Sequence, residues 1–234
     1  MNGAPIADLA IGAQLPLNIT LDIDATFDNY LPRASASTAE WALREGREGC
    51  FLWGASGVGK SHLLQSVCQQ GAQNRRYLPL NALSEFPAAL LLEGVESADL
   101  VAFDALDSVA EHPDWQEPLF DAFNRCRDLG VPMMFAARCA PGSYAAMLPD
   151  LRSRLSSLPV FQMPRFDDEE LAALLRLRSA RRGMQLAEEV VTFVVSRSPR
   201  DPNALMLLLD DLDKASLAQG RAVTIPLIKA LKLL

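Results

Sequence analysis

The fold class of this 234-residue chain is decided by one segment, Gly54-Ala55-Ser56-Gly57-Val58-Gly59-Lys60-Ser61. The segment matches the pattern G-x-x-x-x-G-K-[S/T] at every fixed position, which is typical of a loop that binds nucleotide phosphates. Its glycines let the backbone curl so that successive N–H groups point at phosphate oxygens. Lys60 is predicted to reach the β- and γ-phosphates, the Ser61 hydroxyl to help hold Mg²⁺, and His62 to lie beside the loop.

The residues around this loop supply the context that the pattern requires. The apolar run Cys50–Trp53 before the loop predicts a buried strand. Ser61–Gln70 after the loop predicts a helix whose positive dipole end faces the phosphates. A further helix is expected ahead of the strand, at Thr38–Arg47.

Strand and helix patterns continue to alternate along the chain. Further strands are predicted at Tyr77–Leu80, Leu100–Phe103, Pro132–Ala137 and Pro159–Met163, and helices between them at Leu83–Leu92, Trp115–Leu129 and Leu148–Leu155. Strands that alternate with helices form right-handed βαβ units. We therefore expect an α/β fold with a five-stranded parallel sheet flanked by helices.

Beyond Pro164 the pattern predicts helices only. Apolar residues recur at three- and four-residue spacing in Asp167–Arg181, Ala187–Ser196, Pro202–Ala218 and Ile225–Leu233. Asp167 and Asp201 are predicted to cap two of these helices. We expect three parts: an extended, flexible tail at 1–24, an α/β nucleotide-binding domain at 25–164 and a small all-helical lid domain at 165–234.

Composition narrows the class of protein. Half of the residues are hydrophobic, which favours a sizeable core, and the net charge of −7 argues against a surface built mainly to hold nucleic acid. The four cysteines show no C-x-x-C spacing, so we expect reduced thiols and no metal site made of cysteines. The chain offers no secretory signal and no apolar run of about 18–20 residues, so we expect a cytoplasmic protein.

The second expected element of the phosphate site is an apolar strand that ends in an acid. Leu100-Val101-Ala102-Phe103-Asp104 fits, and Asp104 would face Mg²⁺ because ligands bind at the carboxyl ends of parallel strands. The next position usually carries a carboxylate that orients the attacking water, but here it is Ala105. Asp107, two residues further on, could substitute for it, but on a turn we expect Asp107 to face solvent or to cap a helix. We therefore expect a nucleotide binder with at most weak ATPase activity.

Three segments together resemble a known family. Thr26-Phe27-Asp28-Asn29-Tyr30, the phosphate loop and Val101–Asp104 resemble the AAA+ domain of the bacterial replication initiator DnaA, over roughly residues 22–234. By this resemblance, we expect no counterpart of the DnaA N-terminal domain or of its C-terminal helix-turn-helix domain in these residues. A compact core of this kind is similar to the Hda family of DnaA-homologous regulators. This resemblance also implies that Tyr30 and Leu31 pack beside the nucleotide base.

The resemblance implies a negative regulator of DNA replication initiation. Proteins of this family are understood to sit, with ADP bound, on the DNA-loaded sliding clamp of DNA polymerase III and to stimulate hydrolysis of DnaA-bound ATP. This regulatory inactivation of DnaA needs an arginine donated in trans, which the family pattern places at Arg154 in Leu151-Arg152-Ser153-Arg154-Leu155. Arg152 is a second candidate. The resemblance implies DnaA and the clamp as partners, and contact with DNA and the nucleoid only through them. It also leaves open a homo-oligomer.

The N-terminal segment Gln14-Leu15-Pro16-Leu17-Asn18-Ile19 resembles the short peptide with which bacterial proteins dock on the sliding clamp. The Gln14 amide would satisfy polar groups at a pocket mouth, while Leu15 and Leu17, before and after Pro16, would fill an apolar groove. An ordinary apolar tail is the alternative explanation of this segment.

The chain departs from the family pattern at both sensor positions. Phe135-Ala136-Ala137-Arg138 offers only Arg138 near the place of the first sensor. The second sensor, normally an arginine, aligns with Asn203, and Arg200 could reach the phosphates instead. Together with Ala105, these departures indicate a site that prefers a nucleoside diphosphate such as ADP, with Mg²⁺.

Two other functions compete with regulation. The first is a stand-alone P-loop enzyme such as a small-molecule kinase, which the absence of a clear acceptor-site acid and the presence of Ala105 disfavour. The second is a DnaA-like or helicase-loader ATPase that binds DNA, which the acidic balance disfavours. DNA affinity that falls steeply with salt would favour this second alternative.

Overall fold

The computed structural model describes residues 21–45, 49–70, 74–199 and 201–231. Its sheet has five parallel strands in the order β2-β3-β4-β1-β5. The strands are β1 (Cys50–Trp53), β2 (Arg75–Pro79), β3 (Leu100–Asp104), β4 (Met133–Ala137) and β5 (Val160–Gln162). The predicted α/β class and all five parallel strands are confirmed. Strand β1 lies between β4 and the edge strand β5, so the phosphate loop leaves the carboxyl end of an inner strand.

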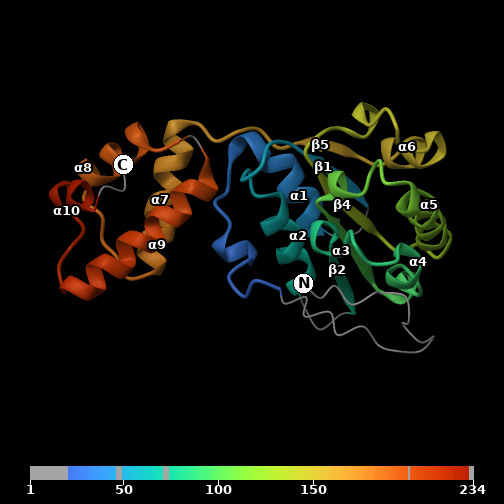
Figure 1. The fold of residues 1–234 in the computed structure, drawn as a ribbon, viewed down its shortest axis with the longest axis horizontal. Coiled ribbons are helices and arrows are strands. Elements are labelled where there is room, and N and C mark those ends of the chain that lie inside the picture. Colours follow the sequence, from blue (N-terminus) through green and yellow to red (C-terminus); the bar gives the residue numbers. More distant parts are fainter. Residues whose placement is uncertain (1–20, 46–48, 71–73, 200, 232–234) are drawn as a thin grey trace, which may run out of the picture.

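Helices cover both faces of the sheet. Ahead of and between the strands lie α1 (Ser37–Glu45), α2 (Lys60–Gln69), α3 (Leu80–Leu83), α4 (Ala88–Leu91), α5 (Pro113–Asp128) and α6 (Pro149–Ser156). After β5 come α7 (Asp168–Arg181), α8 (Glu188–Arg197), α9 (Pro202–Gln219) and α10 (Ile225–Ala230), which form a separate helical part (Figure 1). Among the described residues, no helix combines the length and the apolar character that crossing a membrane would need.

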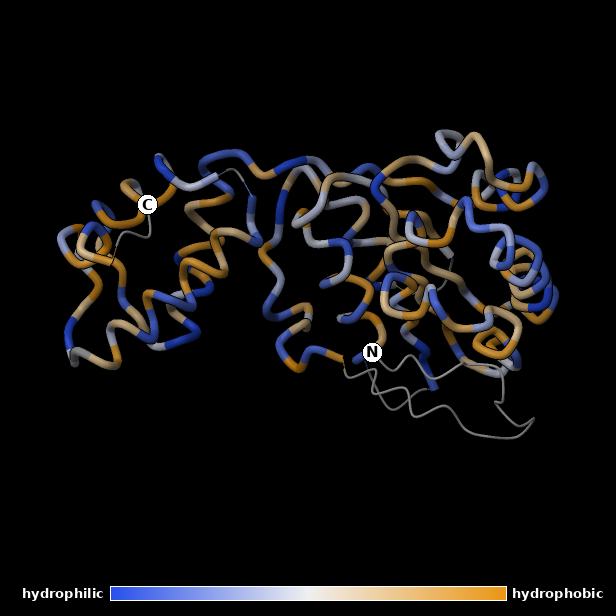
Figure 2. The backbone as a smooth tube through the Cα atoms, in the orientation of Figure 1, coloured by the Kyte–Doolittle hydropathy of each residue, from blue (hydrophilic) through white to orange (hydrophobic). Residues whose placement is uncertain are grey.

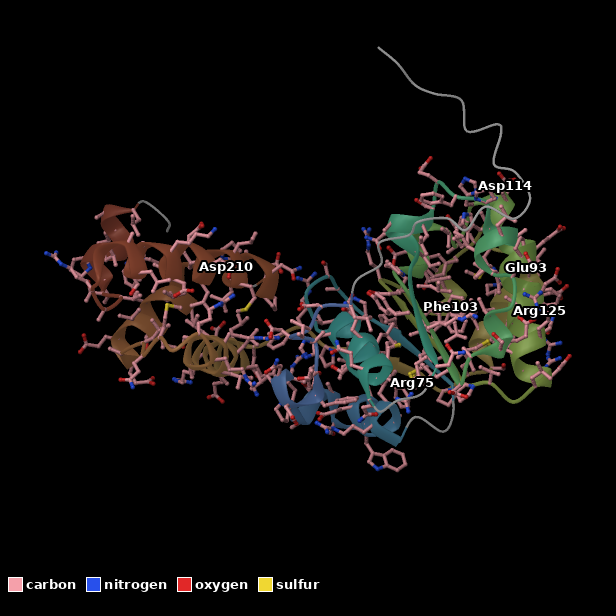
Figure 3. The ribbon with its side chains drawn as sticks, turned by 90° about the horizontal axis from the view of Figure 1, so that it is seen from below. Arg75, Glu93, Phe103, Asp114, Arg125 and Asp210 are labelled. Carbon is pink, nitrogen blue, oxygen red and sulfur yellow. The ribbon has the colours of Figure 1, made fainter. Side chains whose placement is uncertain are left out.

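Alternation along the strands divides the core of the α/β part into two layers. Phe51, Phe103 and Phe135 point to one face, where α5 and α6 cover them, and the rings of Phe103 and Phe135 stack at 4.7 Å. Leu52 and Met134 point to the opposite face, which α1 and α2 cover. Figure 2 shows hydrophobic residues along the strands, and Figure 3 places Phe103 well inside the α/β part.

The helical part has its own hydrophobic cluster. Its buried residues run from Phe166 to Ile228 and come from all four helices, so these helices pack against one another and not only against the sheet. Asp210 on α9 lies on this part, away from the sheet (Figure 3). We propose a domain boundary between residues 164 and 165, where the chain leaves β5.

Side chains stabilise the starts of two of these helices, as predicted. Asp167 accepts from the backbone N–H of Glu170 at 2.7 Å, and Glu170 accepts from the backbone N–H of Asp167 at 3.2 Å, which together form a capping box. Asp201 accepts from the backbone N–H of Asn203 at 3.0 Å and caps α9.

Three predicted elements differ from the structure. The prediction of a single helix at Leu83–Leu92 is wrong. Helices α3 and α4 are separate, because Pro87 has an extended backbone and α4 starts only after it. Strand β2 starts at Arg75, because its first two residues pair with Leu100 and Val101 of β3. Residues 21–24, placed in the tail, contact α2, since the Asp22 N–H donates to Gln65 Oε1 at 2.8 Å.

Candidate nucleotide site

The phosphate loop connects β1 to the N-terminus of α2. Gly54, Gly57 and Gly59 all have φ in the left-handed region, at 154°, 79° and 96°. A Cβ on Gly54 would lie 2.4 Å from the carbonyl oxygen of Met163, and one on Gly57 would lie 2.8 Å from Asp201 Oδ1. Glycine is therefore required at these positions both by backbone conformation and by close neighbours.

Lys60 lies across this loop. Its Nζ donates to the carbonyl oxygens of Gly54 at 2.8 Å and Ala55 at 2.7 Å. Burial lowers the pKa of Lys60, while the nearby carboxylates of Asp104 and Asp107 oppose that shift. The ammonium is thus held against the loop backbone, near the acidic groups at and just after the carboxyl end of β3.

Asp104 ends β3 at the carboxyl edge of the sheet, as predicted, and is buried. The Tyr77 hydroxyl donates to its Oδ2 at 2.6 Å and the backbone N–H of Ala105 donates to its Oδ1 at 2.8 Å. These two hydrogen bonds fix the orientation of the Asp104 carboxylate, and each of its oxygens keeps a second lone pair that can bind another group.

The expectation that Asp107 faces solvent or caps a helix is wrong. Ala105 has φ 54° and ψ 45°, and it is the only non-glycine residue with positive φ among those described. This left-handed turn directs the chain back towards β4. There Asp107 accepts from the backbone N–H of Arg138 at 2.9 Å and forms an ion pair with Arg138 Nε at 2.8 Å.

A cavity of about 410 Å³ lies between this carboxyl edge, the start of α2 and the helical part. Ten of the predicted site residues line it: Tyr30, Leu31, Ser56, Gly57, Gly59, Lys60, Ser61, His62, Asp104 and Asn203. Its lining combines charged side chains, including Lys60, Asp104 and Arg138, with apolar ones, including Leu31 and Phe166. Such a mixed lining suits a ligand that has both charged and apolar groups.

The remaining predicted residues lie elsewhere. Ala55 and Val58 line a smaller neighbouring cavity, and Val58 is buried. Arg200 and the clamp-type segment with Gln14, Leu15, Pro16 and Leu17 lie outside the described residues.

Sequence reasoning missed several cavity residues. They include Asn81, Ser108, Phe166, Leu174, Arg178, Pro202 and Met206. Asn81 follows β2, so its place at the carboxyl edge could have been inferred from the strand pattern. Arg178 belongs to an arginine-rich helix, and no local signal separates it from its neighbours. The Asn203 amide lies 3.4 Å from Ser56 Oγ, which brings α9 against the phosphate loop.

His62 connects three segments around the cavity. Arg178 Nη2 lies 3.3 Å from its Nδ1, and an arginine can only donate, so Nδ1 accepts. Nε2 therefore carries the proton and donates to the carbonyl oxygen of Thr26 at 2.8 Å. Burial lowers the pKa of His62; the Thr26 hydrogen bond opposes that shift, and the Arg178 charge adds to it. The structure thus requires neutral His62.

This arrangement predicts a pH dependence of stability. Because folding lowers the pKa of His62, the unfolded chain binds the proton more readily, so His62 reduces stability as pH falls below about 6.5. His62→Gln keeps one donor and one acceptor but does not titrate. Urea unfolding at about pH 7.5 and about pH 5.5 should show a larger loss for the wild type than for this variant. His112→Gln, at an exposed histidine, is the control; equal losses in wild type and His62→Gln would contradict the assignment.

The predicted arginine finger lies far from this cavity. Arg154 belongs to α6, at the end of the α/β part opposite α7–α10 (Figure 1). Its side chain is half-buried, and within the described ranges its guanidinium makes no hydrogen bond or ion pair. Arg152 Nη1, by contrast, donates to the Tyr144 carbonyl oxygen at 3.4 Å. Arg154 is not among the residues that line the cavity of its own chain.

Comparison with known proteins identifies the family. A family profile described as "Hda, lid domain" matches residues 167–231. An uncharacterized protein of Haemophilus influenzae is 35% identical over 225 residues, covering 92% of this chain and 96% of that protein. The chain belongs to the Hda family of DnaA-related AAA+ proteins. Its α7–α10 part corresponds to the Hda lid, and we use this name for it below.

Solved structures agree on the fold of this Hda-family chain. Domain III of Thermotoga maritima DnaA superimposes with a TM-score of 0.79 at 24% identity, covering 91% of this chain and 98% of that domain. AMPPCP-bound DnaA of Aquifex aeolicus gives 0.69 at 18% identity, covering 81% of this chain and 66% of that one. These similarities establish the AAA+ architecture, an α/β core followed by a helical lid.

Proposed function

We propose that this protein is a negative regulator of replication initiation: an ADP-bound adaptor that, docked on the DNA-loaded sliding clamp, stimulates hydrolysis of DnaA-bound ATP. The observation that carries this proposal is the position of Arg154. An unpaired guanidinium at the end of the molecule remote from its own phosphate loop is available to the nucleotide site of a neighbouring AAA+ protein. An arginine inserted there stabilises the charge that develops on the γ-phosphate.

The chain's own cavity would hold a nucleotide. The phosphate loop and Lys60 fit the phosphates, and Tyr30 and Leu31, which line the same cavity, fit the base. The nucleotide analogue in the Aquifex aeolicus DnaA structure supports this use of the fold. Mg²⁺ would be held by Ser61 and Asp104, which line the same cavity, and the free lone pairs of Asp104 fit a cation that keeps several waters.

The same cavity is poorly equipped to hydrolyse what it binds. Ala105 offers no carboxylate to orient a water, and Asp107, the nearest other acid, is paired with Arg138. At the second-sensor position Asn203 carries no charge that could bind a γ-phosphate. A bound nucleotide would therefore not be turned over in this site, leaving catalysis to the site on DnaA.

The partners follow from the family and from the N-terminal segment. We propose DnaA as the target and the clamp as the platform, contacted through Gln14, Leu15, Pro16 and Leu17. Attachment to a clamp on DNA raises the effective concentration of the adaptor near DnaA without any DNA-binding surface of its own. The net charge of −7 agrees with such indirect contact.

The test is a hydrolysis assay. DnaA loaded with radiolabelled ATP is incubated with sliding clamp loaded on DNA, with and without this protein. We expect hydrolysis to accelerate several-fold. We expect the acceleration to disappear when the clamp is omitted and when Gln14 and Leu15 are both replaced by alanine. An unchanged rate with the intact protein would contradict the proposed function.

A further inference from the structure

Arg33 is a buried cation in the segment that leads from the cavity to α1. Its side chain is 0% exposed, although an arginine stays charged at every ordinary pH. Arginines are rarely buried to this degree unless their charge is paired. Of the three guanidinium nitrogens of Arg33, Nη1 and Nη2 have hydrogen-bond partners, whereas the buried Nε has none.

Its guanidinium contacts the segment that joins the α/β part to the lid. Arg33 Nη2 donates to the carbonyl oxygens of Pro164 at 2.9 Å and Arg165 at 3.0 Å. Both residues lie between β5 and α7, so they form the connection about which the lid would move. The guanidinium also lies 3.9 Å from the ring centroid of Phe166, which lines the cavity.

The same group reaches the lid itself. Arg33 Nη2 forms an ion pair with Glu170 Oε2 at 2.9 Å, and Ser35 Oγ donates to Glu170 Oε1 at 2.9 Å. Burial alone would raise the pKa of Glu170, but the hydrogen bonds from Arg33, Ser35 and the Asp167 N–H outweigh it and lower the pKa. Glu170 is also half of the capping box of α7, so the contact fixes the helix axis as well as the connection.

A longer contact joins this group to the phosphate loop. Arg33 Nη1 lies 3.5 Å from the carbonyl oxygen of Val58. One guanidinium therefore touches the phosphate loop, the connecting segment and the first turn of the lid. Arginine suits this place, because its planar fork directs several donors at once, whereas lysine presents a single point charge.

We propose that Arg33 is a positioning residue that sets the angle between the lid and the phosphate loop and so determines how long a nucleotide is retained. Residues of both parts line the cavity, whereas Arg33 itself does not, so its effect on the ligand acts through the lid. Without Arg33, the carbonyl groups of Pro164 and Arg165 lose this donor and Glu170 loses its ion pair, so the connection can rotate. The proposal rests on the proposed nucleotide binding.

The first test measures dissociation of fluorescent ADP from the full chain. Arg33→Met should release ADP about tenfold faster than the wild type. The matched control is Arg44→Met, because Arg44 also pairs with a carboxylate (Glu40, 2.9 Å) and lies over a ring (Phe27, 4.4 Å), but away from the lid. Unchanged release from Arg33→Met, or equal acceleration in both variants, would overturn the proposal.

The second test needs no nucleotide. Spin labels at Leu129→Cys and Leu207→Cys, two side chains exposed by 68% and 67%, report the distance between the α/β part and the lid in a Cys139→Ser background. Arg33→Met should broaden this distance distribution, and an unchanged distribution contradicts a role in lid position. If the wild type binds no ADP, the proposed function fails, while this measurement still decides the role of Arg33.

A third variant covers the case in which Arg33→Met does not fold. Glu170→Gln weakens the ion pair without removing the buried side chain of Arg33. We expect ADP release to accelerate in the same direction but less, with the distance distribution broadened accordingly. A folded Glu170→Gln protein with wild-type release and distances would also overturn the proposal.

Discussion

Arg154→Ala should return the hydrolysis of DnaA-bound ATP to its unstimulated rate. An arginine donated to a phosphoryl-transfer site contributes roughly 10³–10⁵ in rate in other systems, so the loss should account for the whole stimulation. The geometry supports a role in trans, because α6 lies at the end of the molecule opposite the lid (Figure 1). The measurement is the assay with clamp-loaded DNA, at saturating concentrations of the variant.

Arg152→Ala is the matched control for this prediction. It removes an arginine from the same helix, but one that donates to the Tyr144 carbonyl oxygen of its own chain. We expect this variant to retain most of the stimulation. The opposite pattern, with Arg152→Ala inactive and Arg154→Ala active, would move the finger to Arg152. Stimulation that survives both substitutions would exclude α6 as its source.

Lys60→Ala should abolish tight nucleotide binding. The substitution removes the only ammonium in the phosphate loop, and hydrogen bonds to charged groups contribute about 1.5–3 kcal/mol each. Loss of two such contacts to phosphates corresponds to about 3 kcal/mol or more, which is at least roughly a hundredfold in Kd. Titration with fluorescent ADP measures the affinity, and circular dichroism checks that the variant remains folded.

Lys214→Ala is the control for charge. Lys214 lies on α9 of the lid with its side chain 79% exposed, so the substitution changes net charge equally and leaves the loop intact. We expect wild-type affinity from this variant. If Lys60→Ala binds ADP as tightly as the wild type, the cavity is not the nucleotide site. The regulatory proposal would then lack an identified site for ADP on this chain.

Much of the fold could be predicted because it depends on neighbouring residues. The phosphate loop is recognisable because glycines and a lysine must follow one another at fixed spacing to curl the backbone around an anion. Apolar runs and helical spacing predicted all five strands and the helices of the lid, since these patterns repeat within one element. The predicted cap at Asp167 is local in the same way, since its partner Glu170 lies only three residues along the chain.

Only the tertiary structure decided how the site is completed. Three contacts at the site join residues that are far apart in the sequence. Asp107 and Arg138 are separated by 31 residues, His62 and Arg178 by 116, and Arg33 and Glu170 by 137. No periodicity links residues so far apart, because their meeting depends on the order of the strands and on where the lid packs. Ala105 illustrates the limit: the sequence shows a missing carboxylate, but only the left-handed turn there brings Asp107 to Arg138. Local chemistry thus determined which elements form, and long-range packing determined which side chains meet.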